Sequence, residues 1–182
     1  MYPIKAVFVL SALLATASAS FADVKVGGQN MLASKDIIDN AVNSADHTTL
    51  VAAVKAADLV TTLKGPGPFT VFAPTNAAFA QLPAGTVNSL LKPESRKALT
   101  HILTYHVVAG KYDFASMAKV IKQSNGSAEL ATVSGGKLTL TMNGTHNISV
   151  TDESGNAANI STYDVMQSNG VINVIDKVLL PK

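Results

Sequence analysis

Hydrophobic and polar positions along the chain follow two different periods. In residues 37–42 and 48–63 the apolar side chains recur every three to four positions, which is the spacing of one face of a helix. From Glu129 onward, as in residues 137–142, apolar and polar side chains alternate, which is typical of strands with one buried face. Helices first and strands afterwards predict an α+β domain.

Capping residues and prolines mark where the expected helices begin. Ser, Thr, Asp and Asn side chains can accept hydrogen bonds from the free N–H groups of a first helical turn, and proline is tolerated there because it lacks a donor. The candidate N-caps are Ser34 for the helix at 37–42, Asp46 or Thr48 for the next, Thr75 or Asn76 for a third and Asp113 for the last, while Pro93 is expected to open another helix.

The strand signals lie partly among the helices and mainly after them. Residues 69–72 are β-forming and bounded by prolines, which predicts a short buried strand, and residues 105–108 resemble a strand that ends at Gly110. Glycine turns from Gly135 onward separate the later alternating segments, a spacing typical of an antiparallel meander or sandwich. The segment from Val171 to Ile175, continuing to Leu180, is apolar on both sides and is expected to be central or covered by helices.

The first 22 residues have the pattern of a secretory signal peptide. Lys5 precedes a short apolar run, and small residues follow at the expected cleavage region, with cleavage expected after Ala22. We expect a signal peptide at 1–22, a flexible segment at 23–33 and one domain at 34–182. No later apolar run is long enough to span a bilayer, so the sequence predicts a secreted or periplasmic protein that does not span a membrane.

Composition and charge narrow the classes of function. The chain of 182 residues has 47% hydrophobic positions, no cysteine and a formal net charge of +2. Without cysteine, thiol catalysis, disulfides and zinc–cysteine sites are excluded. Lysine and arginine are scattered rather than clustered, which argues against nucleic acid as a partner.

Arrangements of residues that would carry catalysis are missing from the sequence. His101 and His106 are five positions apart rather than the four of a helical zinc pair, and there is neither a G-x-S-x-G elbow nor a phosphate-binding glycine loop. The acids Asp36, Asp39 and the pair at 152–153 are expected to be caps and turn residues. We therefore predict no catalytic residue, no metal site and no cofactor.

Four N-x-S/T triplets begin at Asn125, Asn143, Asn147 and Asn159. They could carry sugar only in a host that secretes through a glycosylating pathway; otherwise they are turn and strand residues.

Two segments are harder to explain by generic folding, and they resemble the signature boxes of the fasciclin-like (FAS1) family. They read GPFTVFAPTNAAF at 67–79 and LTYHVVAGKY at 103–112. Three further stretches are similar to the same family, namely DHTTLVAAV at 46–54, LPAGTV at 82–87 and NGVINVIDKVLLP at 169–181. The resemblance extends from about residue 34 to 181 and is strongest to secreted bacterial members with a single domain.

This resemblance implies a wedge-shaped β-sandwich flanked by several short α-helices, and a function in cell adhesion or matrix interaction. The implied adhesion residues are Tyr105, His106, Val107 and Val108, with Asp36 and Ile37 as a second candidate pair. The implied structural residues of the family motifs are Phe69, Phe72, Pro74, Thr75, Asn76, Phe79 and Asp176. Members often carry histidine where this chain has Asn173, so any role of that histidine does not transfer.

Alternatives remain open at the level of the sequence. Tyr105 and His106 could instead be packing residues whose polar tips satisfy buried backbone groups near Pro74 and Thr75. The leading hypothesis is a module that binds a cell-surface or matrix protein or polysaccharide through a shallow apolar patch on its helical side. The alternative is an extracellular carrier of a small apolar or aromatic ligand; a hydrolase has no nucleophile motif to support it.

Overall fold

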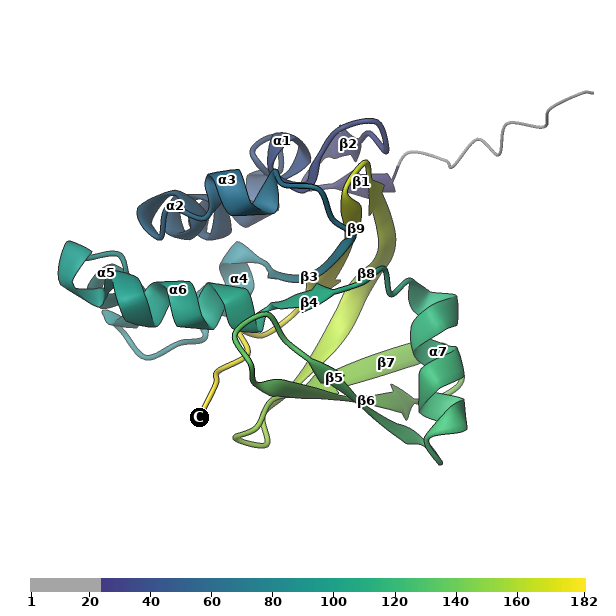
Figure 1. Cartoon of the computed structure of the whole chain (residues 1–182). Coiled ribbons are helices and arrows are strands. Elements are labelled where there is room, and N and C mark those ends of the chain that lie inside the picture. The colour runs from purple at the N-terminus through teal and green to yellow at the C-terminus, as the bar shows by residue number, and fades with distance from the viewer. Residues whose placement is uncertain (1–23) are drawn as a thin grey trace, which may run out of the picture.

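A single seven-stranded sheet dominates the computed structural model, which describes residues 24–182 (Figure 1). The signal peptide expected over 1–22 lies outside the described residues. Along the sheet the strands are β4 (Val107–Ala109), β3 (Phe69–Pro74), β9 (Gly170–Ile175), β8 (Ala157–Gln167), β7 (Asn147–Thr151), β6 (Lys137–Asn143) and β5 (Ser127–Ala131). All neighbours are antiparallel except β3 and β9, which run parallel.

The sheet folds over until its two edge strands meet. Val108 on β4 forms a bridge with Thr132 just after β5, and the N–H of Val133 donates to the carbonyl of Val107 at 2.8 Å. Register shifts between β8 and β9 allow the long strand β8 to bend between the two halves. The expected α+β fold is therefore confirmed, with the wedge-shaped sandwich formed from one nearly closed sheet.

Short helices cover the two ends of the sheet. The helices are α1 (Ile37–Ala41), α2 (Thr48–Ala56), α3 (Val60–Leu63), α4 (Asn76–Ala80), α5 (Thr86–Leu90), α6 (Arg96–Tyr105) and α7 (Phe114–Gln123). Figure 1 shows α1 to α6 gathered at the end of the sheet that holds β3 and β4, whereas α7 stands alone against the meander of β5 to β7.

The hydrophobic core has two parts that match this division. One cluster joins α1, α2, α3 and α6 to β3 and β9, with Ile37, Ala53 and Leu99 among its most buried members. The other lies inside the folded sheet and under α7, where Leu138 and Met117 are fully buried. Since the chain has no cysteine, packing in these two clusters supplies most of the stability.

The N-terminal segment differs from its prediction. In place of a flexible stretch, the described part of 23–33 forms a hairpin of β1 (Val24–Val26) and β2 (Gln29–Met31). Val26 and Met31 are 9% and 4% exposed and belong to the first core cluster, and burial of these two side chains is what orders the segment.

Some of the predicted helix starts are confirmed, and others are wrong. Thr75 and Asp113 accept from the N–H groups of Ala78 and Ser116, and Pro93 opens a 3-10 turn that leads into α6. The predicted cap Ser34 is wrong, because the side chain of Asp36 accepts from Asp39 at the start of α1. Neither Asp46 nor Thr48 caps α2, which continues instead from a 3-10 turn at Ala45–His47.

Three strand predictions have mixed outcomes. The buried strand β3 and the central position of β9 are confirmed. The extension of β9 to Leu180 is wrong, because the pairing ends at Ile175 where its neighbour β3 ends in Pro74, which has no N–H to donate. Tyr105 and His106 were expected in a strand, but Tyr105 is the last residue of α6 and His106 is its C-cap.

Candidate functional site

Tyr105 lies inside the folded sheet with none of its surface exposed. Its hydroxyl donates to the carbonyl of Lys137 at 2.7 Å and accepts from the N–H of Glu153 at 3.0 Å. These two bonds tie the end of α6 to the first residue of β6 and to the loop after β7. Burial raises the pKa of Tyr105, so the phenol stays protonated and available as a donor.

His106 is also buried, at 3% exposure. Its Nδ1 lies 2.8 Å from the carbonyl of Ile102, and its Nε2 accepts from the N–H of Leu179 at 3.0 Å. The acceptor role of Nε2 places the proton on Nδ1. Burial lowers the pKa of His106 to about 4, so the ring is neutral and links α6 to the C-terminal segment.

The predicted adhesion residues therefore do not form an exposed surface. Val107 and Val108 are 5% and 2% exposed, and the polar atoms of Tyr105 and His106 bond backbone groups of Lys137, Glu153, Ile102 and Leu179. A contact role would require surface that these four side chains do not have in this fold. The arrangement supports the packing alternative.

In the Asp36–Ile37 pair, Asp36 lies at the surface and Ile37 lies in the core. Asp36 caps α1 and lies 3.5 Å from the ammonium group of Lys64, which also pairs with Asp39. Ile37 is 2% exposed, so the dipeptide does not present a contiguous contact.

The family-motif residues hold the ends of elements together. Asn76 accepts from the N–H of Thr49 at 3.0 Å and donates to the carbonyl of Ala45 at 2.9 Å, which fixes α4 to the start of α2. Asp176 receives both the backbone and side-chain N–H of Asn159, at 2.7 and 3.1 Å. The remaining motif residues lie on or next to β3, where Phe72 and Phe79 are buried, Phe69 is partly buried, Pro74 ends the strand and Thr75 caps α4.

Asn173, at the position where the family often has histidine, is fully buried in β9. Its amide oxygen accepts from the N–H of Asp164, and its amide nitrogen donates to the carbonyl of Tyr112, both at 3.2 Å. Asp164 has a φ of 58°, and this bond supports it there. Asn173 thus stabilises the irregular part of β8 and the approach to α7.

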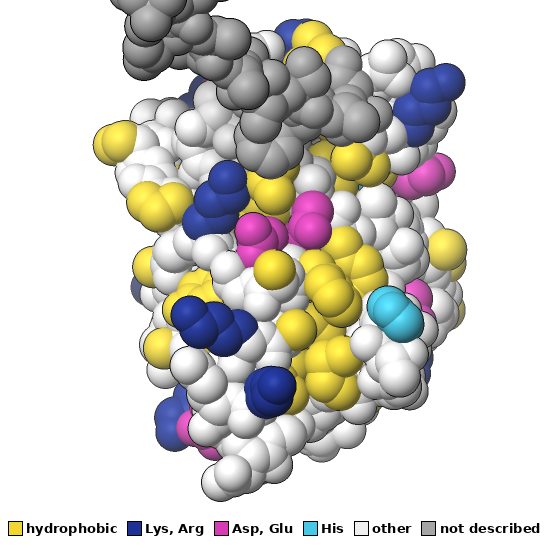
Figure 2. Space-filling view, turned by 90° about the vertical axis from the view of Figure 1, so that its right-hand side faces the viewer, with side chains coloured by type: hydrophobic (Ala, Val, Ile, Leu, Met, Phe, Trp, Pro, Cys, Tyr) yellow, Lys and Arg dark blue, Asp and Glu magenta, His cyan; other side chains and the backbone are white. Residues whose placement is uncertain are grey.

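A partly exposed apolar surface lies around α7, and the sequence did not reveal it. It consists of five partly buried side chains that pack against the second core cluster, which we call the α7 patch: Tyr112, Phe114, Val120, Met142 and Tyr163. Figure 2 shows this face, on which hydrophobic side chains form a strip with two acidic side chains at its upper end. From the sequence, Phe114 and Val120 were expected only to lie on the helix that Asp113 caps.

Contacts position three members of the α7 patch, namely Phe114, Tyr163 and Met142. The rings of Phe114 and Tyr163 meet edge to face, with centroids 5.1 Å apart. The Tyr163 hydroxyl accepts from the N–H of Ile148 at 2.7 Å, and Ile148 pairs with Met142 across β7 and β6. Because these contacts hold the rings of Phe114 and Tyr163 in place, less side-chain conformational entropy is lost when a partner binds them.

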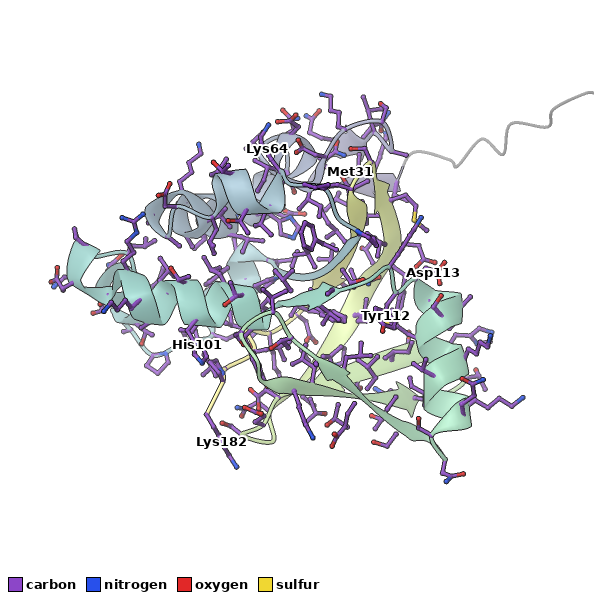
Figure 3. The ribbon with its side chains drawn as sticks, viewed as in Figure 1. Met31, Lys64, His101, Tyr112, Asp113 and Lys182 are labelled. Atoms are coloured by element: carbon purple, nitrogen blue, oxygen red, sulfur yellow. The ribbon has the colours of Figure 1, made fainter. Side chains whose placement is uncertain are left out.

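Two carboxylates border the α7 patch at the start of α7 (Figure 3). Asp113 accepts from Ser116 at 2.8 Å, and Asp164 accepts from the N–H of Phe114 at 2.7 Å. The bonds to Ser116 lower the pKa of Asp113, whereas burial raises the pKa of Asp164 and the charge of Asp113 adds to that rise. Both side chains satisfy free donors of the first turn of α7.

A cavity lies among the helices at the opposite end of the sheet from the α7 patch. It has a volume of about 50 Å³ and is bordered by α1, α2, α3 and β3, with His47 and Ser44 among its few polar side chains. We call it the His47 cavity. His47 is 3% exposed, and it was not singled out from the sequence because a lone histidine has no motif.

Residues 24–182 show neither a metal-ligand cluster nor a helix that could span a membrane. Within that range no three histidine or acidic side chains are grouped as metal ligands would be. The helices of the same range are all too short or too polar to cross a membrane.

A family model described as the Fasciclin domain matches residues 45–181. Among curated relatives, the protein sll1483 of Synechocystis is 50% identical over 145 residues, which cover 80% of this chain and 73% of the relative. The immunogenic protein MPB70 of Mycobacterium bovis is 39% identical, covering 78% of this chain and 66% of the relative. The pig transforming growth factor-beta-induced protein ig-h3 is 36% identical over 72% of this chain but only 17% of its own length.

A solved structure agrees with the fold. It is the FAS1 domain pair of the insect cell adhesion molecule fasciclin I, with a TM-score of 0.62 and 21% sequence identity. The match covers 80% of this chain and 51% of that chain.

Proposed function

Because this chain belongs to the fasciclin domain family, we propose that it is an adhesion module that binds a cell-surface or matrix protein or polysaccharide through the α7 patch. The relative named as a cell adhesion molecule supports the general role. The α7 patch supports the choice of surface, because it is a partly exposed apolar area with aromatic side chains that the fold holds in place.

The residue types in the α7 patch support the choice of this surface as the binding site. The α7 patch contains two tyrosines, a phenylalanine and a methionine, which are residue types enriched at protein interfaces. Tyrosine buries a large area and still offers a hydroxyl to a partner. The buried pair Tyr105 and His106 lacks this access.

We also propose where the protein is located and how it acts. The expected signal peptide and a relative described as a cell surface glycolipoprotein support a secreted or periplasmic location. We infer that the protein acts by binding, without making or breaking covalent bonds, and the structural roles of Asp113, Lys137 and His106 in a cap, an ion pair and a core hydrogen bond support this.

A binding assay tests the adhesion role. The purified protein is applied to cells of the producing organism and to immobilised matrix proteins and polysaccharides, and bound protein is measured against concentration. We expect saturable binding to at least one surface, inhibited by unlabelled protein. Binding that rises linearly everywhere, or turnover of generic ester and glycoside substrates, would argue against an adhesion module.

A further inference from the structure

The His47 cavity leaves one buried polar atom without a partner. Nδ1 of His47 lies 2.8 Å from the hydroxyl of Ser44, but its Nε2 is the buried side-chain nitrogen or oxygen within residues 24–182 that has no hydrogen-bond partner. Such groups are rare in folded proteins, because an unpaired buried donor or acceptor is costly. The carbonyl of Ala73 is close enough to the ring to offset part of the lowering of its pKa by burial, but it does not meet the geometry of a hydrogen bond to Nε2.

The local bonds determine which form of the ring fits best. Ser44 is 3% exposed, and among the described residues its hydroxyl bonds only to His47. If Ser44 donates to Nδ1, the hydroxyl proton is satisfied and the ring proton lies on Nε2. In the other tautomer both the hydroxyl proton and Nε2 would lack partners. The favourable arrangement therefore presents an unused N–H donor.

The rest of the cavity is apolar. Its walls include Leu50, Val54 and Val71, and His106, which also borders it, has both ring nitrogens bonded elsewhere. A water molecule needs two to four polar partners to be held firmly. The free donor of His47 is one such partner, and the surface that the cavity exposes is otherwise almost entirely apolar, so water would be held weakly there.

From this geometry we propose that the His47 cavity binds a small, largely apolar molecule with one hydrogen-bond-accepting oxygen, such as a short ketone or aldehyde, and that His47 Nε2–H donates to that oxygen. Size limits the ligand, because the cavity of about 50 Å³ is a third of the roughly 150 Å³ that accepts benzene. The cavity is lined by other elements than those of the α7 patch, so this site is independent of the adhesion proposal.

The test uses acetone as the probe with an acceptor oxygen and xenon as the probe without one. Amide signals of the ¹⁵N-labelled protein are followed during titration, with attention to Val54 and Val71 on the cavity wall. We expect both probes to shift these signals saturably. His47→Leu should weaken acetone at least fivefold and leave xenon binding intact, because it keeps an apolar side chain and removes the donor.

Two further variants keep the test decisive. His101→Leu changes an exposed histidine on α6 that does not border the cavity (Figure 3), and it should leave acetone binding unchanged. Val54→Ile adds a methyl group at the wall and should reduce binding of both probes, which serves if His47→Leu does not fold. Acetone binding that is equal in the original and His47→Leu proteins, or wall signals that respond to neither probe, would overturn the proposal.

Discussion

Single buried polar side chains join parts of this protein that are far apart in the sequence. His106 connects the end of α6 to Leu179, and Tyr105 connects it to Lys137 and Glu153. Each bond satisfies a backbone group that would otherwise be buried without a partner. At the residue scale, the second signature box is therefore a connector within the core.

His106 should make the stability of the protein depend on pH. Its folded pKa of about 4 lies below the ordinary value near 6.5, so the unfolded chain binds more protons between these values. Stability is then complete at pH 7 and falls as pH decreases toward 4. We expect a loss of about 2 kcal/mol at pH 5 from this group, measured by urea unfolding at both pH values.

A variant separates His106 from other titrating groups. His106→Leu should be less stable at pH 7, because the N–H of Leu179 loses its acceptor, but its stability should fall less between pH 7 and 5. His101→Leu, at an exposed position, should keep the pH profile of the original protein. Identical slopes for the original and His106→Leu proteins would contradict the role given to this ring.

Tyr105→Phe should destabilise the fold without changing adhesion. The change leaves the carbonyl of Lys137 and the N–H of Glu153 without the hydroxyl that now bonds them, at a cost of about 1 to 3 kcal/mol. Urea unfolding measures the stability, and the adhesion assay is repeated on the folded protein. If adhesion were lost while stability stayed unchanged, Tyr105 would be a residue that contacts the partner, which would contradict this prediction.

Helix starts and close strand pairs are the decisive features at the scale of elements. Asp113 and Asp164 bond the first N–H groups of α7, which fixes the helix that carries part of the α7 patch. We expect Asp113→Ala to cost about 1 kcal/mol and to weaken adhesion modestly, because the first turn of α7 would fray. Hydrogen exchange at Ser116 measures the fraying, and unchanged exchange would contradict this explanation.

Gly170 keeps β3 and β9 in their parallel register. A Cβ atom there would lie 2.1 Å from the carbonyl oxygen of Phe69, which belongs to the backbone and cannot move away cheaply. Gly170→Ala should therefore cost about 3 kcal/mol, at the upper end of overpacking effects. Gly135→Ala is the control, since its Cβ meets no atom within 4 Å and only its positive φ costs energy. Equal thermal unfolding of the two variants would contradict the tight contact.

The sequence predicts elements better than it predicts surfaces. Period and caps correctly indicated β3, α7 and the meander, because these depend on neighbouring residues. The strand assignment of Tyr105 and His106 failed because β-forming side chains also suit a buried helix end. The α7 patch could not be foreseen, since Met142 and Tyr163 join Phe114 only through the folding of the sheet.

At the scale of the whole molecule, the α7 patch and the His47 cavity lie at the two ends of the fold. The α7 patch lies around α7 on the meander half, and the His47 cavity is lined by residues of α1, α2 and α3 in the other half; Figure 1 shows these helices on opposite sides of the molecule. The nearly closed sheet between them has its edges joined at Val108 and Thr132, which leaves little free edge for unwanted strand pairing. Such a scaffold is suited to presenting a fixed exterior to a partner.

The most direct test of this account measures the affinity of two matched surface variants for the surface that the original protein binds. Met142→Lys places a charge within the α7 patch, and Val133→Lys places one at a valine that is 48% exposed outside it. We expect Met142→Lys to weaken binding at least tenfold with little change in melting temperature, and Val133→Lys to bind like the original protein. Equal affinity of the two variants would contradict the claim that the protein acts through the α7 patch.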